Sequence, residues 1–167
     1  MNTVKGKVIF LDVDGVLATS QQIHEYAKTH GGHCPPGYPQ IDMKCVYRLF
    51  TIAKACDASI VVSSTWRKNM RDMLDLMKAL NRVVNAFVGV SIDNIDSTPV
   101  LPSGNRGEEI LAYCKSHGID RSDILVLDDD VGDLHQVADR HIRTDYKVGL
   151  TDEDVTKAIQ LLKGGQS

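Results

Sequence analysis

Short apolar runs, each closed by polar residues, recur along the chain. The clearest three cover residues 8–11, 60–62 and 124–127. Unbroken stretches of valine, isoleucine and leucine are typical of strands that are buried on both faces of a parallel sheet. Two weaker strand candidates cover residues 87–90 and 141–143. The pattern therefore predicts a parallel sheet whose strands come from most of the chain.

The segments between these runs place apolar residues three and four positions apart, which is the spacing of an amphipathic helix. Such segments cover residues 43–53, 70–80, 110–114 and 151–162. Asp42 is of a type favoured at helix N-caps, and Gly118 of a type favoured just beyond a helix end. Thr151 and Asp154 form a variant of the capping box. Strands that alternate with helices predict an α/β fold with helices on both faces of the sheet.

One stretch, residues 18–41, fits neither pattern, and its glycines and prolines mark it as a loop-like insertion. The chain has 167 residues, which is the size of one domain. We therefore expect residues 1–167 to form a single domain in which residues 18–41 are a small lid or flap.

Composition and charge exclude several classes of protein. Apolar residues make up 43% of the chain and charged residues 25%, which is ordinary globular usage and excludes a disordered chain. The net charge of −3 excludes a globally basic nucleic-acid coat. The sequence shows no secretory signal, no membrane-length apolar run and no C-x-x-C pair. We expect a cytoplasmic protein with reduced thiols, no membrane association and no obligate protein partner.

The sharpest chemical feature is the pair Asp12 and Asp14, directly after the first apolar run. Gly15 lets the chain turn there, so both carboxylates can crowd one site, although an isolated sequence of this kind is also a common surface turn. Residues 128–130 and Asp133 follow another buried run. Parallel strands bring their carboxyl ends together, and a shared cation relieves the repulsion that results. Oxygen ligands alone favour Mg²⁺.

Two further features suit a phosphate group. Ser63 and Ser64 follow the second run, and hydroxyls beside a helix N-terminus can hold phosphate oxygens, with an ordinary helix cap as the alternative. Arg106 begins a predicted helix, where a cation is unfavourable for the helix dipole. That position indicates another role for Arg106, with a solvated surface arginine as the alternative.

Taken in order, these motifs resemble those of the haloacid dehalogenase-like (HAD) phosphohydrolase superfamily. They are V-I-F-L-D-V-D-G-V-L, the serine of I-V-V-S-S-T-W-R, a basic residue, and L-V-L-D-D-D, in which Asp129 and Asp133 fit D-x-x-x-D. The resemblance covers about residues 7–150. It implies a three-layer, Rossmann-like α/β fold with a minimal cap.

The resemblance also implies a phosphomonoester hydrolase that works through an aspartyl-phosphate. Asp12 would be the nucleophile, and Asp14 would protonate the leaving alkoxide and later activate water. Ser63 would bind a phosphoryl oxygen and Arg106 would neutralise its charge. The candidate substrate contacts beside them are Ser64 and Arg67.

By the same resemblance, Mg²⁺ would be held by the Asp12 carboxylate, the Asp14 backbone carbonyl and an aspartate of the fourth motif. The sequence leaves open whether Asp128 or Asp129 is the direct ligand. Asp133 would support the metal from further out.

The expected substrate is a phosphorylated nucleic-acid end or a nucleotide. A small lid leaves the site open to large substrates, and S-S-T-W-R with L-D-D-D resembles the HAD modules of RNA-repair proteins and polynucleotide kinase-phosphatases. The kinase motif G-x-x-x-x-G-K-[ST] is missing from the sequence. Basic residues that either guide a phosphodiester chain or are ordinary exposed charges are Arg67, Lys68, Arg71 and Arg82.

Several alternatives remain open. The substrate can instead be a sugar phosphate or another small metabolite. A signalling receiver domain and a catalytically silent HAD-like scaffold are the non-enzymatic alternatives. Trp66 either packs in the core or stacks on a base. A zinc site is a minor alternative to a polar lid, and its candidate ligands are His30, His33, Cys34 and Cys45.

Overall fold

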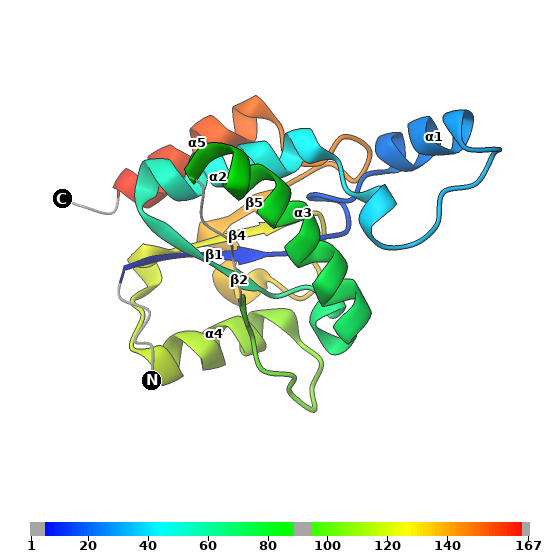
Figure 1. The fold of residues 1–167 in the computed structure, drawn as a ribbon. Coiled ribbons are helices and arrows are strands. Elements are labelled where there is room, and N and C mark those ends of the chain that lie inside the picture. Colours follow the sequence, from blue (N-terminus) through cyan, green and yellow to red (C-terminus); the bar gives the residue numbers. More distant parts are fainter. Residues whose placement is uncertain (1–5, 89–94, 165–167) are drawn as a thin grey trace.

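A single sheet of five parallel strands organises the molecule, and helices cover both of its faces (Figure 1). The computed structural model describes residues 6–88 and 95–164. The strands are β1 (Lys7–Leu11), β2 (Ala58–Val62), β3 (Asp96–Ser97), β4 (Ile124–Asp128) and β5 (His141–Arg143), in the spatial order β3-β2-β1-β4-β5. The predicted α/β fold with a Rossmann-like parallel sheet is confirmed.

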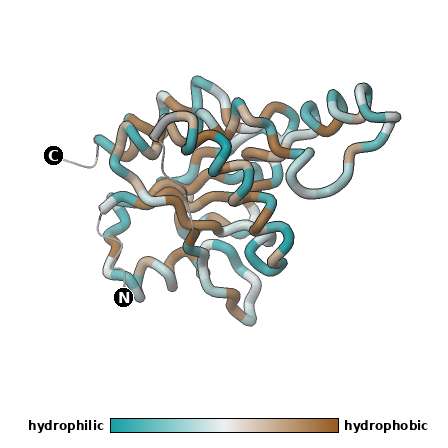
Figure 2. Tube along the Cα trace, viewed as in Figure 1, coloured by the Kyte–Doolittle hydropathy of each residue, from teal (hydrophilic) through white to brown (hydrophobic). Residues whose placement is uncertain are grey.

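The two faces of the sheet carry separate apolar cores. Helices α2 (Met43–Cys56), α3 (Met70–Val88) and α5 (Asp152–Gly164) cover one face, and α4 (Arg106–His117) covers the other. Side chains alternate along β1, so Ile9 and Leu11 belong to the first core, whereas Val8 and Phe10 belong to the second. Figure 2 shows the strands as the hydrophobic interior between more polar helices.

Strand register brings the polar strand ends side by side. Leu11 is paired with Val62 in β2 and with Leu127 in β4. Beyond these pairs, the amide of Asp12 donates to the carbonyl of Leu127 at 2.9 Å, and the amide of Ser63 donates to that of Leu11 at 2.9 Å. The first residues after three neighbouring runs therefore meet at one edge of the sheet, as predicted.

The predicted helix ends are confirmed. Asp42 caps α2, where its carboxylate accepts from the amide of Lys44 at 2.8 Å. Gly118 follows α4 in the left-handed conformation with φ of 64°. At the start of α5, Thr151 and Asp154 exchange backbone-to-side-chain hydrogen bonds of 2.9 and 3.2 Å. Local sequence signals set these boundaries.

The prediction of a strand over residues 87–90 is wrong for residues 87 and 88. Residues 87 and 88 end α3, whose apolar stripe runs through Leu76, Leu80 and Val83, and residues 89 and 90 lie outside the described residues. The edge strand is β3, two residues long, and the amide of Thr98 extends its pairing by donating to Val62 at 3.0 Å. The helix that begins at Met70 therefore continues over the first half of this apolar run.

The insertion at residues 18–41 is more ordered than a loop. It contains α1 (Ser20–Thr29), capped by Thr19, and a short 3-10 helix, η1 (Tyr38–Gln40). A bridge between Ala18 and Ile41 closes its base, and α1 projects away from the body of the molecule (Figure 1). The helical spacing of Ile23, Tyr26 and Ala27 carried this signal, but α1 buries no residue, so its apolar stripe is weak.

Three further 3-10 helices complete the described fold, namely η2 (Thr65–Lys68), η3 (Arg121–Asp123) and η4 (His135–Arg140). Of the helices in the described part of the chain, none is long and apolar enough to cross a membrane.

Candidate active site

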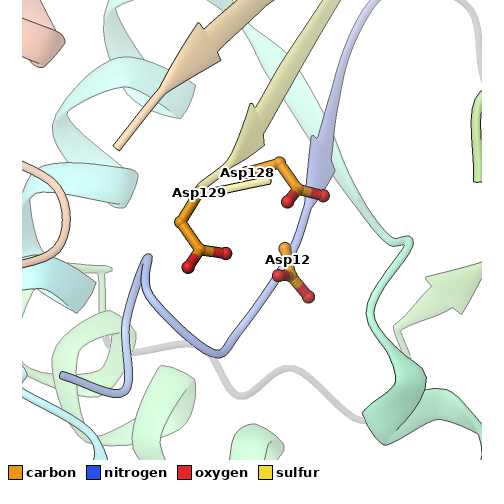
Figure 3. Close-up of side chains that lie close together, drawn as sticks. All are labelled: Asp12, Asp128 and Asp129. Atoms are coloured by element: carbon orange, nitrogen blue, oxygen red, sulfur yellow. The ribbon is translucent and has the colours of Figure 1, made fainter. Parts of the chain in front are cut away.

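Three carboxylates meet at the carboxyl ends of β1 and β4. Asp12, Asp128 and Asp129 each place an oxygen within 4.8 Å of the others (Figure 3). Asp12 is 5% exposed and Asp128 is fully buried. Across residues 6–88 and 95–164, this is the one group of three or more side chains of metal-ligating type. Its oxygen-only composition suits a hard divalent cation.

The negative charge of this group perturbs its own protonation. Burial and the neighbouring Asp128 raise the pKa of Asp12 from 3.8 to about 6, against opposing contributions from Arg106 and from a side-chain hydrogen bond with Ser64. Burial and Asp128 also raise the pKa of Asp129. Burial first, and then repulsion from Asp128, disfavour the ionised forms of these carboxylates, and a bound cation offsets that penalty.

Arg106 provides the positive charge nearest to this group. It is the first residue of α4, and its guanidinium forms ion pairs with Asp128 and with Asp12, the latter at 3.3 Å. Burial alone would lower the pKa of Arg106, but the two carboxylates raise it, so the guanidinium stays charged. Its side chain is 20% exposed, and it is therefore not a solvated surface arginine.

Alternation along the strands explains which aspartates Arg106 reaches. Asp12 and Asp128 continue the series of side chains that faces α4, following Phe10 and Val126. Asp129 is one residue further along and belongs to the opposite series. The two oxygens of Asp128 are engaged by Arg106 and by the amide of Asp130, the latter at 2.9 Å. Asp129 is half-buried and makes no ion pair within the described part of the chain.

The turn after β1 fits closely against Asp129. Gly15 has φ of 75°, and a methyl group on its Cα would overlap the carboxyl group of Asp129. The hydroxyl of Thr144 donates to the carbonyl of Gly15 at 2.7 Å and fixes the turn from the other side. A residue other than glycine would therefore be strained and would displace Asp129.

We expect Gly15→Ala to lower thermal stability and to weaken binding of a divalent cation. The matched control is Gly31→Ala, because Gly31 has φ of 73° with nothing within 4 Å. Both variants carry the cost of a left-handed alanine, roughly 1–2 kcal/mol, but only Gly15→Ala moves Asp129. The measurement is the melting temperature with and without Mg²⁺. Equal Mg²⁺-dependent stabilisation of the two variants would contradict this account.

Two buried serines follow β2. Ser63 is fully buried, and its hydroxyl has no hydrogen-bond partner among the described residues. The Ser64 hydroxyl caps η2 by accepting from the amide of Trp66 at 3.3 Å, and its proximity to Asp12 lowers the pKa of that carboxyl. The alternative of an ordinary helix cap therefore describes Ser64 in part, but it does not describe Ser63.

Arg67 supports this turn from within. Its side chain is 3% exposed and forms an ion pair of 2.5 Å with Glu109, which is also 3% exposed. Its guanidinium donates to the carbonyls of Ser63 and Ser64 at 2.8 and 2.6 Å and to that of Thr98 at 3.2 Å. The geometry thus gives Arg67 a structural position instead of a surface one. Lys68, Arg71 and Arg82, in contrast, are exposed.

Asp14 and Asp133 lie outside the three-carboxylate group. Asp14 is exposed, and its carboxylate accepts from the indole Nε1–H of Trp66 at 3.0 Å. Asp133 is exposed, and its backbone carbonyl accepts from the amide of Gly107 in α4 at 2.8 Å. Trp66 is 7% exposed and belongs to the apolar core, which favours the packing interpretation over base stacking.

The candidate zinc ligands are not gathered. His30 stacks on Tyr26 with ring centroids 3.9 Å apart, and the Cys45 thiol is buried against the carbonyl of Leu150 at 3.6 Å. All four cysteines are free, and the described residues place no histidine or cysteine in a ligand group. The polar-lid interpretation of residues 30–34 is the one that fits.

Sequence reasoning missed three contacts at this edge of the sheet. Glu109 anchors Arg67, Thr144 holds the turn at Gly15, and Trp66 contacts Asp14. Glu109 carried a signal, because a glutamate on the side of a helix that faces a sheet needs a cationic partner. Nothing in the local sequence around Thr144 distinguishes it from an ordinary strand-end residue.

A comparison with known protein families matches residues 8–155 to the HAD domain in Swiss Army Knife RNA repair proteins. The match includes all five strands of the central sheet except Lys7 at the start of β1, the insertion, and every residue of the proposed site. Searches of curated proteins and of solved structures found no match. Because the matched family covers the sheet and its carboxylate-bearing edge, the chain belongs to the HAD domains of Swiss Army Knife RNA repair proteins.

Proposed function

We propose that the protein is a Mg²⁺-dependent phosphomonoester hydrolase that forms an aspartyl-phosphate on Asp12. Membership of the HAD class supports a phosphohydrolase. The observation that carries the proposal is the environment of Asp12. This buried carboxylate is paired with a cationic Arg106, and the buried hydroxyl of Ser63, in the segment next to it, has no hydrogen-bond partner among the described residues. Such a site offers an anionic nucleophile together with donors for an anionic substrate.

In the first step, an Asp12 oxygen attacks phosphorus and the bond to the ester oxygen breaks. Arg106 neutralises charge on the phosphoryl oxygens, and the Ser63 hydroxyl donates a hydrogen bond to one of them. Asp14 gives its proton to the departing alkoxide. In the second step, Asp14 takes a proton from water, which attacks phosphorus and releases phosphate from Asp12. Phosphoryl transfer needs this positioning and charge neutralisation more than it needs covalent chemistry from other side chains.

The residues at this edge of the sheet fit a divalent cation. Asp12, the backbone carbonyl of Asp14 and Asp129 would hold it, because Asp128 already has a partner for each of its oxygens. Asp128 then supports the site by fixing Arg106, and Asp133 is a candidate for support at its rim. When bound, Mg²⁺ offsets the repulsion between the nucleophile and the substrate.

The proposed substrates are phosphorylated nucleic-acid ends or nucleotides. Two observations support this class over sugar phosphates. The insertion that contains α1 projects away from the sheet (Figure 1), as expected for a small cap that suits extended substrates. The matched family is described by its occurrence in RNA repair proteins. The exposed Lys68 and Arg71, on the segment that follows the buried serines, add positive charge for a phosphodiester backbone.

A substrate panel tests the proposal. Purified protein is incubated with 3′- and 5′-phosphorylated oligonucleotides, nucleoside monophosphates, hexose phosphates and an aryl phosphate, with Mg²⁺ or with a chelator, and phosphate release is measured. We expect Mg²⁺-dependent release, fastest from the nucleic-acid or nucleotide esters. A preference for hexose phosphates would contradict the substrate class alone. No release from any ester would favour a non-enzymatic binding module.

Arg106→Ala is expected to lower the rate by roughly a hundredfold or more, because losing one donor to a developing charge costs about 2.7–4 kcal/mol. Arg106→Lys should recover part of this loss, since the charge remains while the two-pronged geometry is lost. Arg121→Ala is the matched control, because Arg121 pairs with Asp139 on the surface. Full activity in Arg106→Ala would point instead to Lys115, which is exposed on the same helix.

A further inference from the structure

Trp66 makes a polar contact that core packing does not require. It lies on η2 and is 7% exposed, and its indole Nε1–H donates to Asp14 Oδ2 at 3.0 Å. A buried tryptophan usually finds a partner for its N–H group. Here the partner comes from the loop after β1, 52 residues away in the sequence. The contact joins the segments that follow two neighbouring strands.

The backbone of Trp66 is held in place by its neighbours. The amide of Trp66 donates to the Ser64 hydroxyl at 3.3 Å, and its carbonyl accepts from the amide of Asn69 at 3.1 Å. In the same turn, the guanidinium of Arg67 donates hydrogen bonds to the carbonyls of Ser63 and Ser64. Because the backbone of Trp66 is fixed and its ring is buried in the apolar core, the indole N–H is a fixed donor.

Asp14 is the less constrained partner. Its side chain is exposed, whereas its backbone is fixed by a bridge to Ala18 and by Gly15, whose amide donates to the carbonyl of Ala18 at 2.8 Å. The indole of Trp66 is the side-chain partner that the structure gives to the Asp14 carboxylate. An exposed carboxylate samples several rotamers, and one rigid donor selects among them.

We propose that Trp66 is a positioning residue that orients the Asp14 carboxylate for proton transfer. The inference rests on the proposed function, in which Asp14 acts as the acid and then as the base. Trp66 need not touch the substrate for this role. It sets the direction of the group that exchanges a proton with the leaving oxygen and with water.

The test is a kinetic comparison of Trp66→Phe with the wild type, on the ester that the substrate panel identifies. We expect kcat to fall by roughly ten- to a hundredfold with KM little changed, because a misplaced catalytic group can cost about a hundredfold. The matched control is Tyr113→Phe. Tyr113 is also a buried aromatic donor, and its hydroxyl donates to Asp96 at 2.6 Å, away from the three-carboxylate group. This control should keep the wild-type kcat.

A second measurement does not depend on turnover. Trp66 is the only tryptophan in the chain, so intrinsic emission reports on this one indole. Asp14→Ala removes the acceptor of its N–H group and should change the emission intensity or maximum. Asp130→Ala removes another exposed carboxylate of the site region and should not. This measurement keeps the inference open to refutation even if Trp66→Phe folds poorly.

The outcomes separate the two proposals. A wild-type protein that releases no phosphate from any ester overturns the proposed function and, with it, the role of Trp66. An active wild type with unchanged kcat in Trp66→Phe overturns the role of Trp66 alone. So does an increase in KM without a fall in kcat, or an emission spectrum that is unaffected by Asp14→Ala. A selective fall in kcat together with the emission change supports the positioning role.

Discussion

Asp12→Asn is expected to abolish phosphate release while leaving the metal-free protein at least as stable as the wild type. An amide cannot attack phosphorus as an anionic nucleophile, and it is a weaker ligand for a hard cation. Arg106 keeps Asp128 as an ion-pair partner in this variant, so no buried charge is left unpaired. A variant that retained a near wild-type rate would rule out Asp12 as the nucleophile.

The difference in stability between this variant and the wild type should depend on pH in a defined direction. The pKa of Asp12 is raised from 3.8 to about 6 in the folded protein, so the folded state holds this proton more tightly than the unfolded chain does. The wild type therefore loses stability as the pH rises from about 4 through about 6. Asp12→Asn has no such group. Over that pH interval its free energy of unfolding should therefore rise relative to that of the wild type, by up to about 3 kcal/mol.

Denaturant unfolding at pH 4, 5, 6 and 8 in the presence of a chelator measures this difference. Asp130→Asn is a suitable control, because the backbone amides of Gly132 and Val131 lower the pKa of the exposed Asp130 instead of raising it. Removing that carboxylate should give no advantage at high pH. An Asp12→Asn variant that is less stable than the wild type at pH 8 would show that burial and the repulsion with Asp128 do not destabilise the ionised Asp12 in the folded protein.

The convergence of the site could be predicted from sequence because strand ends follow simple rules. Apolar runs fixed where β1, β2 and β4 stop, and parallel pairing then placed Asp12, Ser63 and Asp128 in one row. The start of α4 at Arg106 followed from the helical pattern. These inferences needed only local periodicity and the rule that parallel strands share a carboxyl edge.

Which of Asp128 and Asp129 faces Arg106 could not be predicted in this way. It depends on which face of the sheet carries the helix that begins with Arg106. The crossover places α4 on the face of Phe10 and Val126, so Asp128 faces the guanidinium and Asp129 does not. A single-residue step along a strand reverses the direction of the side chain, and sequence spacing alone does not say which face is which.

Polar contacts between residues far apart in the sequence could not be predicted either. The indole of Trp66 donates to Asp14 in the loop after another strand. Arg67 pairs with Glu109, which lies on α4, 42 residues later in the sequence. From the sequence, Arg67 was predicted to be a substrate contact or an exposed charge, because arginine is mostly a surface residue. Its burial becomes understandable only when the carbonyls at the end of β2 and the carboxylate on α4 are placed around it.

Breaking the ion pair of Arg67 and Glu109 is expected to cost about 3–5 kcal/mol, since it leaves one charge buried without a partner. Glu109→Ala tests this by denaturant unfolding. It removes the carboxylate that also accepts from the amide of Leu101 at 3.0 Å. Replacing both residues, as in Arg67→Met with Glu109→Leu, should cost less than the sum of the single changes, because no charge is then stranded.

Arg48→Ala provides the comparison for this prediction. Arg48 also forms an ion pair, at 2.8 Å, but its partner Asp152 is 85% exposed. Exposed pairs contribute about 0–1 kcal/mol, so Arg48→Ala should leave the protein close to wild-type stability. If Glu109→Ala lost as little stability as Arg48→Ala, Arg67 would be stabilised by its backbone carbonyls and not by Glu109. A large loss in Glu109→Ala alone would instead identify the buried pair as the element that holds the serine turn beside Asp12.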